Sequence, residues 1–309
     1  MSTSNSYGTL SILHLSDTHL LAQGLHSQSV DTRQTLLEAL RSLLPLEELD
    51  LLVISGDVSD DGTPESYRSV RELAEDYAHR RDALVLYAIG NHDARPGFWA
   101  VLGNGHPGSP AEPDGGQLPV YGSTLLGGFR IVSLDSSVPG RTHGYLDPGQ
   151  LDWLTGELST PSESGTVLVL HHPPVEPVTP LHDGIELQNP EALVEALQGS
   201  DVRLILSGHY HHALGDTLLV GDRAIPVLVA PGVVNLNDVL AAEGHERALR
   251  ASGAQFVTVF RADPAAAAAR VRSLPLNLGR AEPLFDLPPE EVAAISARIS
   301  ARPDESGNG

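Results

Sequence analysis

Short apolar runs that end in polar residues recur along the chain and predict the strands of a sheet. Five of them, rich in Val, Ile and Leu, lie at residues 10–15, 51–54, 83–89, 167–170 and 202–206. Uninterrupted apolar runs of this length are typical of strands that are buried on both faces. Further apolar segments predict additional strands at residues 131–134, 216–220, 225–229, 256–260 and 271–276.

Helical patterns lie between the apolar runs. Residues 31–44 carry leucines at a spacing that places them on one face of a helix. Residues 64–80 begin with Pro and end with Arg, which suits the two ends of a helix. Similar patterns predict helices at residues 148–158, 190–198 and 290–300, whereas the alanine run at 265–269 is too short to decide.

The alternation of strands and helices predicts an α/β fold with a largely parallel arrangement. A chain of 309 residues, 41% of them hydrophobic, can bury a full core. We expect one domain over residues 9–280, a flexible N-terminus at 1–8, and a C-terminal helix with a flexible tail at 281–309. Two long loops, 103–116 and 173–190, either wall a site or are surface excursions without a role.

The composition limits the kinds of partner that the chain can bind. Lys and Arg total 19 against 40 Asp and Glu, which gives a formal net charge of −21. Such a surface repels nucleic acid and anionic membranes, so we expect neither as a partner. Residues 1–8 contain no basic residue and no apolar stretch, and no apolar run has the length of a membrane span. These features predict a cytoplasmic protein.

Polar residues directly follow the five strongest strands. Because loops that leave the carboxyl ends of parallel strands converge on one crevice, we expect their side chains to meet. The chain has no Cys, so any metal here is held by nitrogen and oxygen, which suits Mn, Fe, Zn or Co. The candidate ligands are Asp17, His19, Asp57, Asn91, His171, His209 and His211. Seven ligands exceed what one tetrahedral ion takes, whereas two ions that share a carboxylate would use them all.

Each motif has a plainer interpretation when it stands alone, such as an ordinary turn at Asp57. His209 and His211 are a stronger pair, because side chains two residues apart point the same way from an extended strand. His14 lies inside the first strand and is expected in the core. His172 and His212 sit beside candidate ligands and could support them. No recognisable context surrounds the remaining histidines His26, His79, His106, His182 and His245.

Together, the polar motifs resemble the signature of the calcineurin-like metallophosphoesterases over residues 10–210. That signature reads D-x-H, G-D-x-x-D, G-N-H-D/E, a later His, and G-H-x-H, and every block is intact here. The resemblance implies a four-layer α/β/β/α sandwich of two mixed sheets flanked by helices. It also implies an enzyme, namely a metal-dependent phosphoric diester hydrolase.

The resemblance further implies that two metal ions are held per chain. One ion would be held by Asp17, His19 and His211. The other would be held by Asn91, His171 and His209. Asp57 would bridge the two ions, and a hydroxide that they share would attack the phosphorus atom.

For the substrate, the resemblance implies roles for residues beside the metals. Asn91 and His92 would bind it, His92 would protonate the leaving oxygen, and Asp60 would orient the His92 ring. His143 lies in a Gly-flanked loop after the strand at 131–134, so it either reaches the substrate or is an exposed loop residue.

Within the superfamily, the motif forms and the chain length look like class III cyclic-nucleotide phosphodiesterases. We therefore expect a small phosphodiester as substrate, with 3′,5′-cyclic AMP as the first candidate, and a glycerophosphodiesterase or a broad-specificity phosphoesterase as the alternative. A non-catalytic interaction module is the rival, and the complete set of ligands disfavours it. Asp61 stands where the phosphoprotein-phosphatase branch has Arg, which disfavours that role. A homodimer is compatible with these features.

Overall fold

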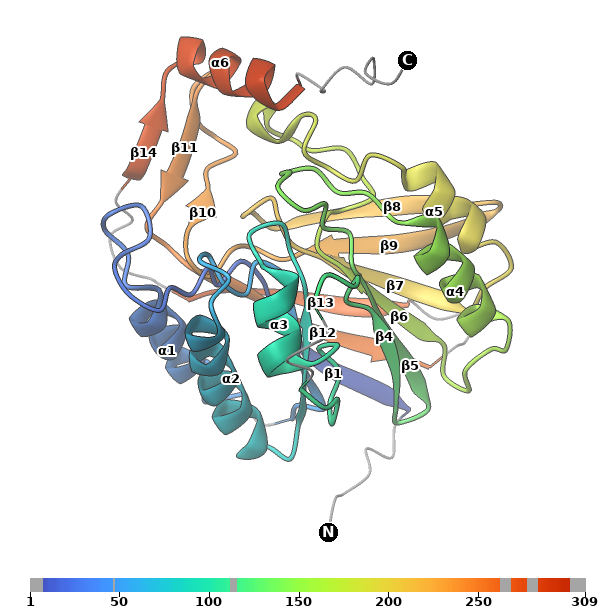
Figure 1. Cartoon of the computed structure of the whole chain (residues 1–309). Coiled ribbons are helices and arrows are strands. Elements are labelled where there is room, and N and C mark those ends of the chain that lie inside the picture. The colour runs from blue at the N-terminus through green and yellow to red at the C-terminus, as the bar shows by residue number, and fades with distance from the viewer. Residues whose placement is uncertain (1–7, 47, 112–115, 262–267, 277–282, 301–309) are drawn as a thin grey trace.

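The structure, a computed structural model, describes residues 8–46, 48–111, 116–261, 268–276 and 283–300, and in them two large sheets pack face to face (Figure 1). The first sheet has the strand order β13-β12-β1-β2-β3. Its strands are β1 (Thr9–Leu15), β2 (Leu51–Ser55), β3 (Leu84–Ala88), β12 (Gly253–Phe260) and β13 (Ala269–Pro275). β1, β2 and β3 run parallel, and antiparallel pairing adds β12 and β13 on one side.

The second sheet has the order β4-β5-β6-β7-β9-β8. Its strands are β4 (Gly122–Leu126), β5 (Phe129–Leu134), β6 (Thr166–Leu170), β7 (Val202–Ser207), β8 (Leu214–Val220) and β9 (Arg223–Val229). β5, β6, β7 and β9 are parallel, whereas β4 and β8 pair antiparallel at the two edges. Both sheets are therefore mixed, as the family resemblance implies.

Helices cover the outer face of each sheet (Figure 1). The first sheet is covered by α1 (Thr32–Ser42), α2 (Pro64–His79) and α3 (Arg95–Leu102), and the second by α4 (Pro148–Leu158) and α5 (Pro190–Ala196). The side chains of Asp31, Thr63 and Asp147 accept backbone N–H groups in the first turns of α1, α2 and α4. These caps satisfy donors that a helix start leaves free, and they fix where the helices begin.

Strands of each sheet contribute side chains to two hydrophobic cores, one on each face of the sheet. In β1, Leu13 and Leu15 pack with the helices, whereas Leu10 and Ile12 face the other sheet. The central core, between the sheets, also contains Leu204 of β7. Burial on both faces explains the uninterrupted apolar runs of the sequence. The expected four-layer α/β/β/α sandwich is confirmed.

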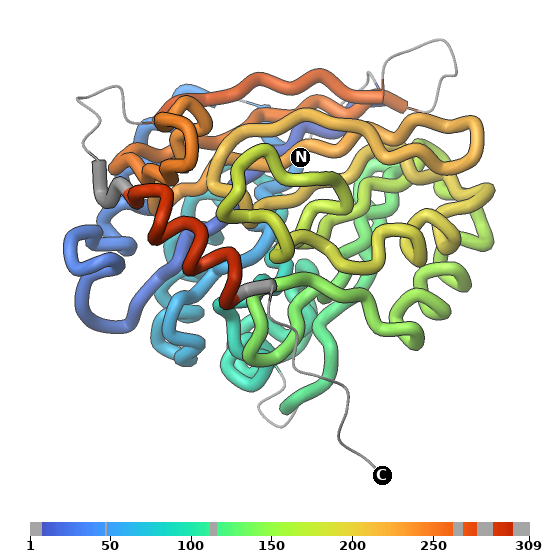
Figure 2. The backbone as a smooth tube through the Cα atoms, turned by 90° about the horizontal axis from the view of Figure 1, so that it is seen from above, coloured from blue at the N-terminus to red at the C-terminus, as the bar shows by residue number. Residues whose placement is uncertain are grey.

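A third, smaller sheet of β10 (Leu236–Asn237), β11 (Glu246–Leu249) and β14 (Pro283–Leu287) lies beside the sandwich (Figure 1). The last helix, α6 (Pro289–Ser300), follows β14, and we call these four elements the C-terminal cap. Figure 2 shows α6 next to the segment that contains the short 3-10 helix η1 (Pro180–His182), and the two are in contact. The cap therefore reaches the loop that follows β6.

Some elements were absent from the sequence prediction, namely α3, β4 and the three strands of the cap. β10 has only two residues, and β4 alternates in burial without an apolar run, so neither carries the pattern of a buried strand. Parts of four expectations lie outside the described residues: the boundary at residue 280, residues 1–7 of the flexible N-terminus expected at 1–8, residues 301–309 of the C-terminal segment expected at 281–309, and residues 265–267 of the undecided run at 265–269. They remain predictions.

We expect Leu204→Ala to lower the free energy of unfolding by about 2–5 kcal/mol, because Leu204 is fully buried between the sheets and its truncation leaves a cavity. Leu219→Ala is the matched control, since Leu219 is 69% exposed on the edge strand β8. Urea unfolding of both variants measures the difference. Equal midpoints would contradict the central core.

Candidate metal centre

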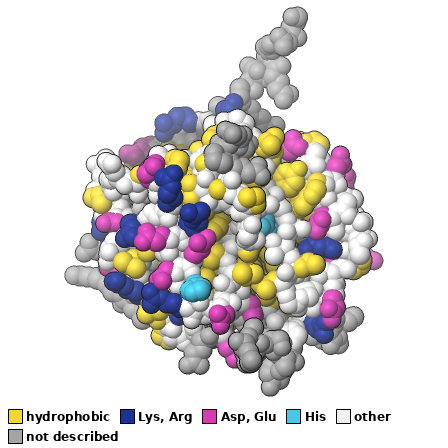
Figure 3. All heavy atoms as spheres, turned by 60° about the horizontal axis from the view of Figure 1, so that its bottom comes forward, with side chains coloured by type: hydrophobic (Ala, Val, Ile, Leu, Met, Phe, Trp, Pro, Cys, Tyr) yellow, Lys and Arg dark blue, Asp and Glu magenta, His cyan; other side chains and the backbone are white. Residues whose placement is uncertain are grey.

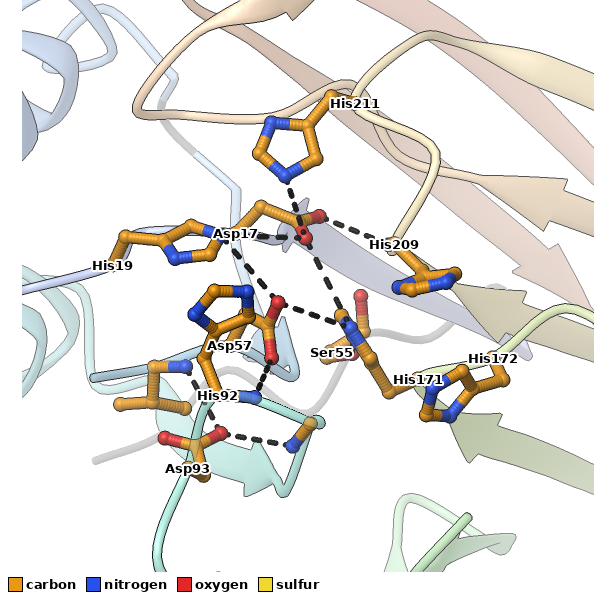
Figure 4. A network of polar contacts seen from close by, with 12 residues as sticks. Asp17, His19, Ser55, Asp57, His92, Asp93, His171, His172, His209 and His211 are labelled. Carbon is orange, nitrogen blue, oxygen red and sulfur yellow. Dashed lines mark hydrogen bonds and ion pairs between the residues drawn. The ribbon is translucent and has the colours of Figure 1, made fainter. Parts of the chain in front are cut away.

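The five polar motifs meet at the carboxyl ends of β1, β2, β3, β6 and β7, as the sequence predicts (Figure 4). Backbone hydrogen bonds join the loops: the amides of Asp17 and His19 donate to the carbonyls of Gly56 and Asp57. On the second sheet, the amide of Gly208 donates to the carbonyl of His171 at 3.0 Å. The site is therefore built from both sheets, at the rim where they face each other.

The backbone is strained where candidate ligands lie. Among the described residues, eight other than glycine have a positive φ, and five of them are the candidate ligands Asp17, His19, Asp57, His209 and His211. A left-handed conformation costs a non-glycine residue about 1–2 kcal/mol, although Asp and His tolerate it better than most. Such outliers cluster at functional sites, because the surrounding structure holds them there.

Two motif glycines are required by close packing rather than by chemistry. A Cβ at Gly90 would overlap the backbone nitrogen and Oδ1 of Asp57, and one at Gly208 would overlap Oγ of Ser16. Side chains at these positions would push the loops apart. The glycines therefore let neighbouring loops bring their ligands together.

The candidate ligands form two neighbouring groups, and Asp57 lies between them. The ligand atoms of Asp17, His19 and His211 lie within 4.8 Å of one another, and so do those of Asp57, His171 and His209. Asp57 Oδ2 lies 3.4 Å from His19 Nε2 and 3.4 Å from His171 Nε2, so it stands between the groups. The resemblance adds Asn91 to the second group and shares Asp57 between both, and that assignment stays a prediction.

Several buried polar atoms of the candidate ligands lack a hydrogen-bond partner among the described residues. They are Asp17 Oδ1, His19 Nε2, Asn91 Oδ1 and His171 Nε2. Figure 4 shows Asp17, His19 and His171 pointing toward one another, and Asp17 Oδ1 lies 3.2 Å from His211 Nε2. Burial of unpaired polar atoms is costly, whereas a bound cation satisfies all of them. The donor set therefore fits metal ions with nitrogen and oxygen ligands.

The other ring nitrogen of each candidate histidine contacts an oxygen. His19 Nδ1 lies 2.9 Å from Asp60 Oδ1, and His171 Nδ1 lies 2.9 Å from the Ser55 carbonyl. His211 Nδ1 lies 3.3 Å from the Asn235 carbonyl, and His209 Nε2 lies 3.0 Å from the Ile185 carbonyl. Such contacts fix the tautomer that leaves the second nitrogen free as a ligand. His209 is thus the one of the four that would offer Nδ1.

Electrostatics favours a cation at this place. Burial alone would raise the pKa of Asp17, but His211 and His171 outweigh it and lower the pKa. Burial alone would lower the pKa of His171, but Asp57 and Asp17 raise it to about 9. The carboxylates thus stay ionised and draw positive charge. Because metal ions compete with protons for these groups, metal binding would release protons.

His92 lies at the open side of the centre, and its side chain is 43% exposed. Its Nδ1 is 2.9 Å from Asp60 Oδ1, which is the contact that the resemblance implies. Burial would lower the pKa of His92, but Asp57 and Asp60 raise it to about 9. Asp60 also contacts His26 Nδ1 at 3.3 Å, a role for His26 that nothing in the sequence indicated.

Other histidines support the site or belong to the core. His14 is fully buried, and its Nε2 lies 2.8 Å from Ser55 Oγ, which agrees with the core position expected for it. His172 Nδ1 contacts Ser136 Oγ at 2.8 Å, and its Nε2 contacts the carbonyl of Thr142 at 3.2 Å. The loop that carries His143 therefore packs against His172. A substrate contact for His143 itself stays a prediction.

Asp93 has a structural role that the sequence analysis missed. Its carboxylate accepts the backbone N–H groups of Val58, Ser59 and Gly90, and the hydroxyl of Tyr67 at 3.0 Å. It thereby ties the loop after β2 to the loop after β3. Burial, helped by Asp57, raises the pKa of Asp93 to about 7. Its position as the last residue of the G-N-H-D motif was the available signal.

The model of the calcineurin-like phosphoesterase family matches residues 10–213, which is most of the chain. The chain belongs to the calcineurin-like phosphoesterase family. The match ends just after His211, so it includes every candidate metal ligand and leaves out the C-terminal cap.

Three relatives of this calcineurin-like phosphoesterase are informative. A probable cyclic nucleotide phosphodiesterase of Rhodococcus erythropolis is 38% identical over 251 residues, 81% of this chain and 79% of the relative. A cAMP/cGMP dual specificity phosphodiesterase of Mycobacterium tuberculosis is 36% identical over 253 residues, 81% of this chain and 76% of the relative. A glycerophosphodiester phosphodiesterase of Enterobacter lignolyticus is 30% identical over 207 residues, 65% of this chain and 70% of the relative.

Among solved structures, a purple acid phosphatase of yellow lupin has the same fold, with a TM-score of 0.51 and 12% identity. The similarity covers 86% of this calcineurin-like phosphoesterase and 54% of the lupin chain. At this identity the likeness supports the fold alone.

We expect Asp57→Ala to remove more metal than Asp17→Ala, because Asp57 Oδ2 lies 3.4 Å from a histidine of each group, whereas Asp17 Oδ1 lies 3.2 Å from His211 but 4.0 Å from His171. Elemental analysis after repletion with Mn(II) and desalting would measure the loss. Asp76→Ala, which removes an exposed carboxylate paired with Arg80, is the control. Equal losses in the Asp57 and Asp17 variants would contradict the bridging position.

Proposed function

We propose that this enzyme hydrolyses small phosphodiesters, including 3′,5′-cyclic AMP, at a centre of two divalent metal ions. The enzyme class, a metal-dependent phosphoric diester hydrolase, agrees with the family and with the named relatives. The observation that carries the proposal is the position of Asp57 Oδ2, between two groups of ligands that each can hold an ion.

The proposed ligands of one ion are Asp17, His19 and His211, and those of the other are Asn91, His171 and His209, with Asp57 shared. Mn, Fe, Zn and Co all suit these nitrogen and oxygen donors. When bound, such ions supply Lewis-acid chemistry: they lower the pKa of water to roughly 7 and neutralise charge on the phosphoryl oxygens.

His92 is the proposed proton donor to the leaving oxygen. Its Nδ1 is held by Asp60, which leaves Nε2 for the substrate, and its ring is exposed to an incoming diester. Burial lowers the pKa of the ring, but Asp57 and Asp60 raise it to about 9, which favours the protonated form that a proton donor needs. General acid catalysis of this kind contributes typically ~100- to 10,000-fold to the rate. Asn91, adjacent in the chain, is proposed to contact the substrate as well as an ion.

Charge and local structure support a small diester over larger phosphorylated partners. The formal net charge is −21, and on the face seen in Figure 3 basic side chains are mixed with acidic ones rather than gathered. Polynucleotides require clustered cations to replace counterions. Asp61 accepts the amides of Ala22 and Thr63 and so fixes its loop, which gives it a structural role where the protein phosphatases have Arg.

The cellular location, the partners and the oligomeric state of the enzyme are also proposals. No helix among the described residues combines the length and the apolar character that a bilayer crossing requires. A cytoplasmic location without membrane or nucleic-acid partners is part of the proposal, and the net charge of −21 supports the absence of nucleic acid. A homodimer is part of the same proposal, which size-exclusion chromatography with light scattering would test.

We expect His92→Ala to keep its metal and to lower kcat on cyclic AMP by ~100- to 10,000-fold, because the ribose oxygen leaves poorly without a proton. The loss should be much smaller on bis-(p-nitrophenyl) phosphate, whose leaving group needs no proton. His79→Ala, an exposed histidine on α2, is the control. An unchanged kcat on cyclic AMP would show that the proton comes from elsewhere.

The substrate class is tested by kcat/KM for cyclic AMP, a glycerophosphodiester and p-nitrophenyl phosphate, measured on one metal-loaded batch. We expect both diesters to exceed the monoester, and a chelator to abolish all three activities. A monoester preference of about tenfold, which is about 1.4 kcal/mol in transition-state binding, would refute the diesterase proposal. A similar preference for the glycerophosphodiester would replace cyclic AMP and leave the metal chemistry intact.

A further inference from the structure

Glu246 is a buried carboxylate that the proposed reaction does not use. It lies on β11 of the C-terminal cap, and the residue is only 2% exposed. Its Oε1 accepts the backbone N–H of Leu181 at 3.1 Å, and the Thr179 side chain also bonds to it. Both partners belong to the loop that follows β6. Since a buried carboxylate is expensive unless it is hydrogen-bonded, these contacts hold the loop against the cap.

The contacts continue from Thr179 toward His182. Thr179 Oγ1 lies 2.6 Å from His182 Nδ1, and His182 Nε2 lies 3.3 Å from Asn237 Nδ2 on β10. A carboxylate only accepts hydrogen bonds, so the Thr179 hydroxyl donates to Glu246 and accepts from His182 Nδ1–H. His182 Nε2 is then the acceptor of the Asn237 amide. The donors and acceptors of this series therefore follow from one another, and the Glu246 carboxylate, which can only accept, fixes the direction of all the hydrogen bonds.

The same loop also contacts a candidate metal ligand. The Ile185 amide donates to the carbonyl of His182 at 3.1 Å, and the Ile185 carbonyl lies 3.0 Å from His209 Nε2. That carbonyl can only accept, so His209 carries its proton on Nε2 and presents Nδ1 to Asp57 and His171. The other side of the turn is held by α6, where Ser296 Oγ donates to the carbonyl of Pro180 at 3.2 Å.

Given the proposed metal assignment, on which this inference rests, we infer that Glu246 is a positioning residue for His209. Through Thr179, Leu181 and the turn at η1, it places the Ile185 carbonyl that fixes the His209 tautomer. Glu246, which lies outside the family match, thereby tunes the metal position of His209, whereas the loop of His211 has a separate contact with the cap, in which Asn237 of β10 donates its backbone N–H to the carbonyl of His211.

The test compares metal affinities in the apo protein, titrated with Mn(II) by calorimetry. His209→Ala and His211→Ala first identify which binding step belongs to which group. We expect Glu246→Ala to weaken the step that His209→Ala removes by about tenfold, and to leave the other step unchanged. Nitrogen-15 spectra of the histidine rings give a second readout, in which the variant should lose the uniform Nε2–H form of His209.

Asp238→Ala is the matched control, because Asp238 also belongs to the cap region and pairs with Arg247 at 2.7 Å, without touching the loop after β6. It should preserve both binding steps. Unchanged affinities in Glu246→Ala, or equal weakening of both steps in the Glu246 and Asp238 variants, would overturn the inference.

Thr179→Val addresses the case in which Glu246→Ala fails to fold, since it removes only the hydroxyl between Glu246 and His182. It should weaken the same step by a smaller factor, and wild-type binding at both steps would overturn the inference. A wild-type protein that binds a single ion would instead contradict the proposed metal assignment. In that case the ring spectra still decide whether Glu246 controls His209.

Discussion

The Asp57 carboxylate, buried between two groups of histidines, is the interaction on which the rest of the site depends. Its Oδ2 faces His19 from the first sheet and His171 from the second, and its Oδ1 accepts the backbone N–H of His92. A buried carboxylate with so few hydrogen bonds is unfavourable alone. It is compatible with folding because cations, or protonated imidazoles in their absence, lie on both sides of it.

That arrangement requires a rigid support. Several candidate ligands have left-handed backbone conformations, and several of their polar atoms are unpaired, so the site lowers the stability of the fold. Three apolar cores offset this cost, and the central one joins the two sheets directly beneath the site. Because close-packed sheets resist deformation, the ligands stay near one another despite this cost.

The orientation of two ligands comes from outside the motifs. Carbonyl groups of Ile185 and Asn235 contact His209 and His211. The loop of Ile185 is itself held by the C-terminal cap. The polar centre thus has an inner layer that belongs to the family motifs and an outer layer that is assembled from the remainder of this chain.

The sequence by itself determined the buried strands, the principal helices and the candidate ligands, because apolar periodicity and short motifs are local patterns. Only the tertiary structure decided which nitrogen His209 presents, that His26 meets Asp60, that Asp93 ties two loops, and that Glu246 supports the loop after β6. Each of these depends on segments far apart in the chain that approach within hydrogen-bonding distance. The spacing of residues along the sequence does not reveal such contacts, because they arise only from the packing of the two sheets.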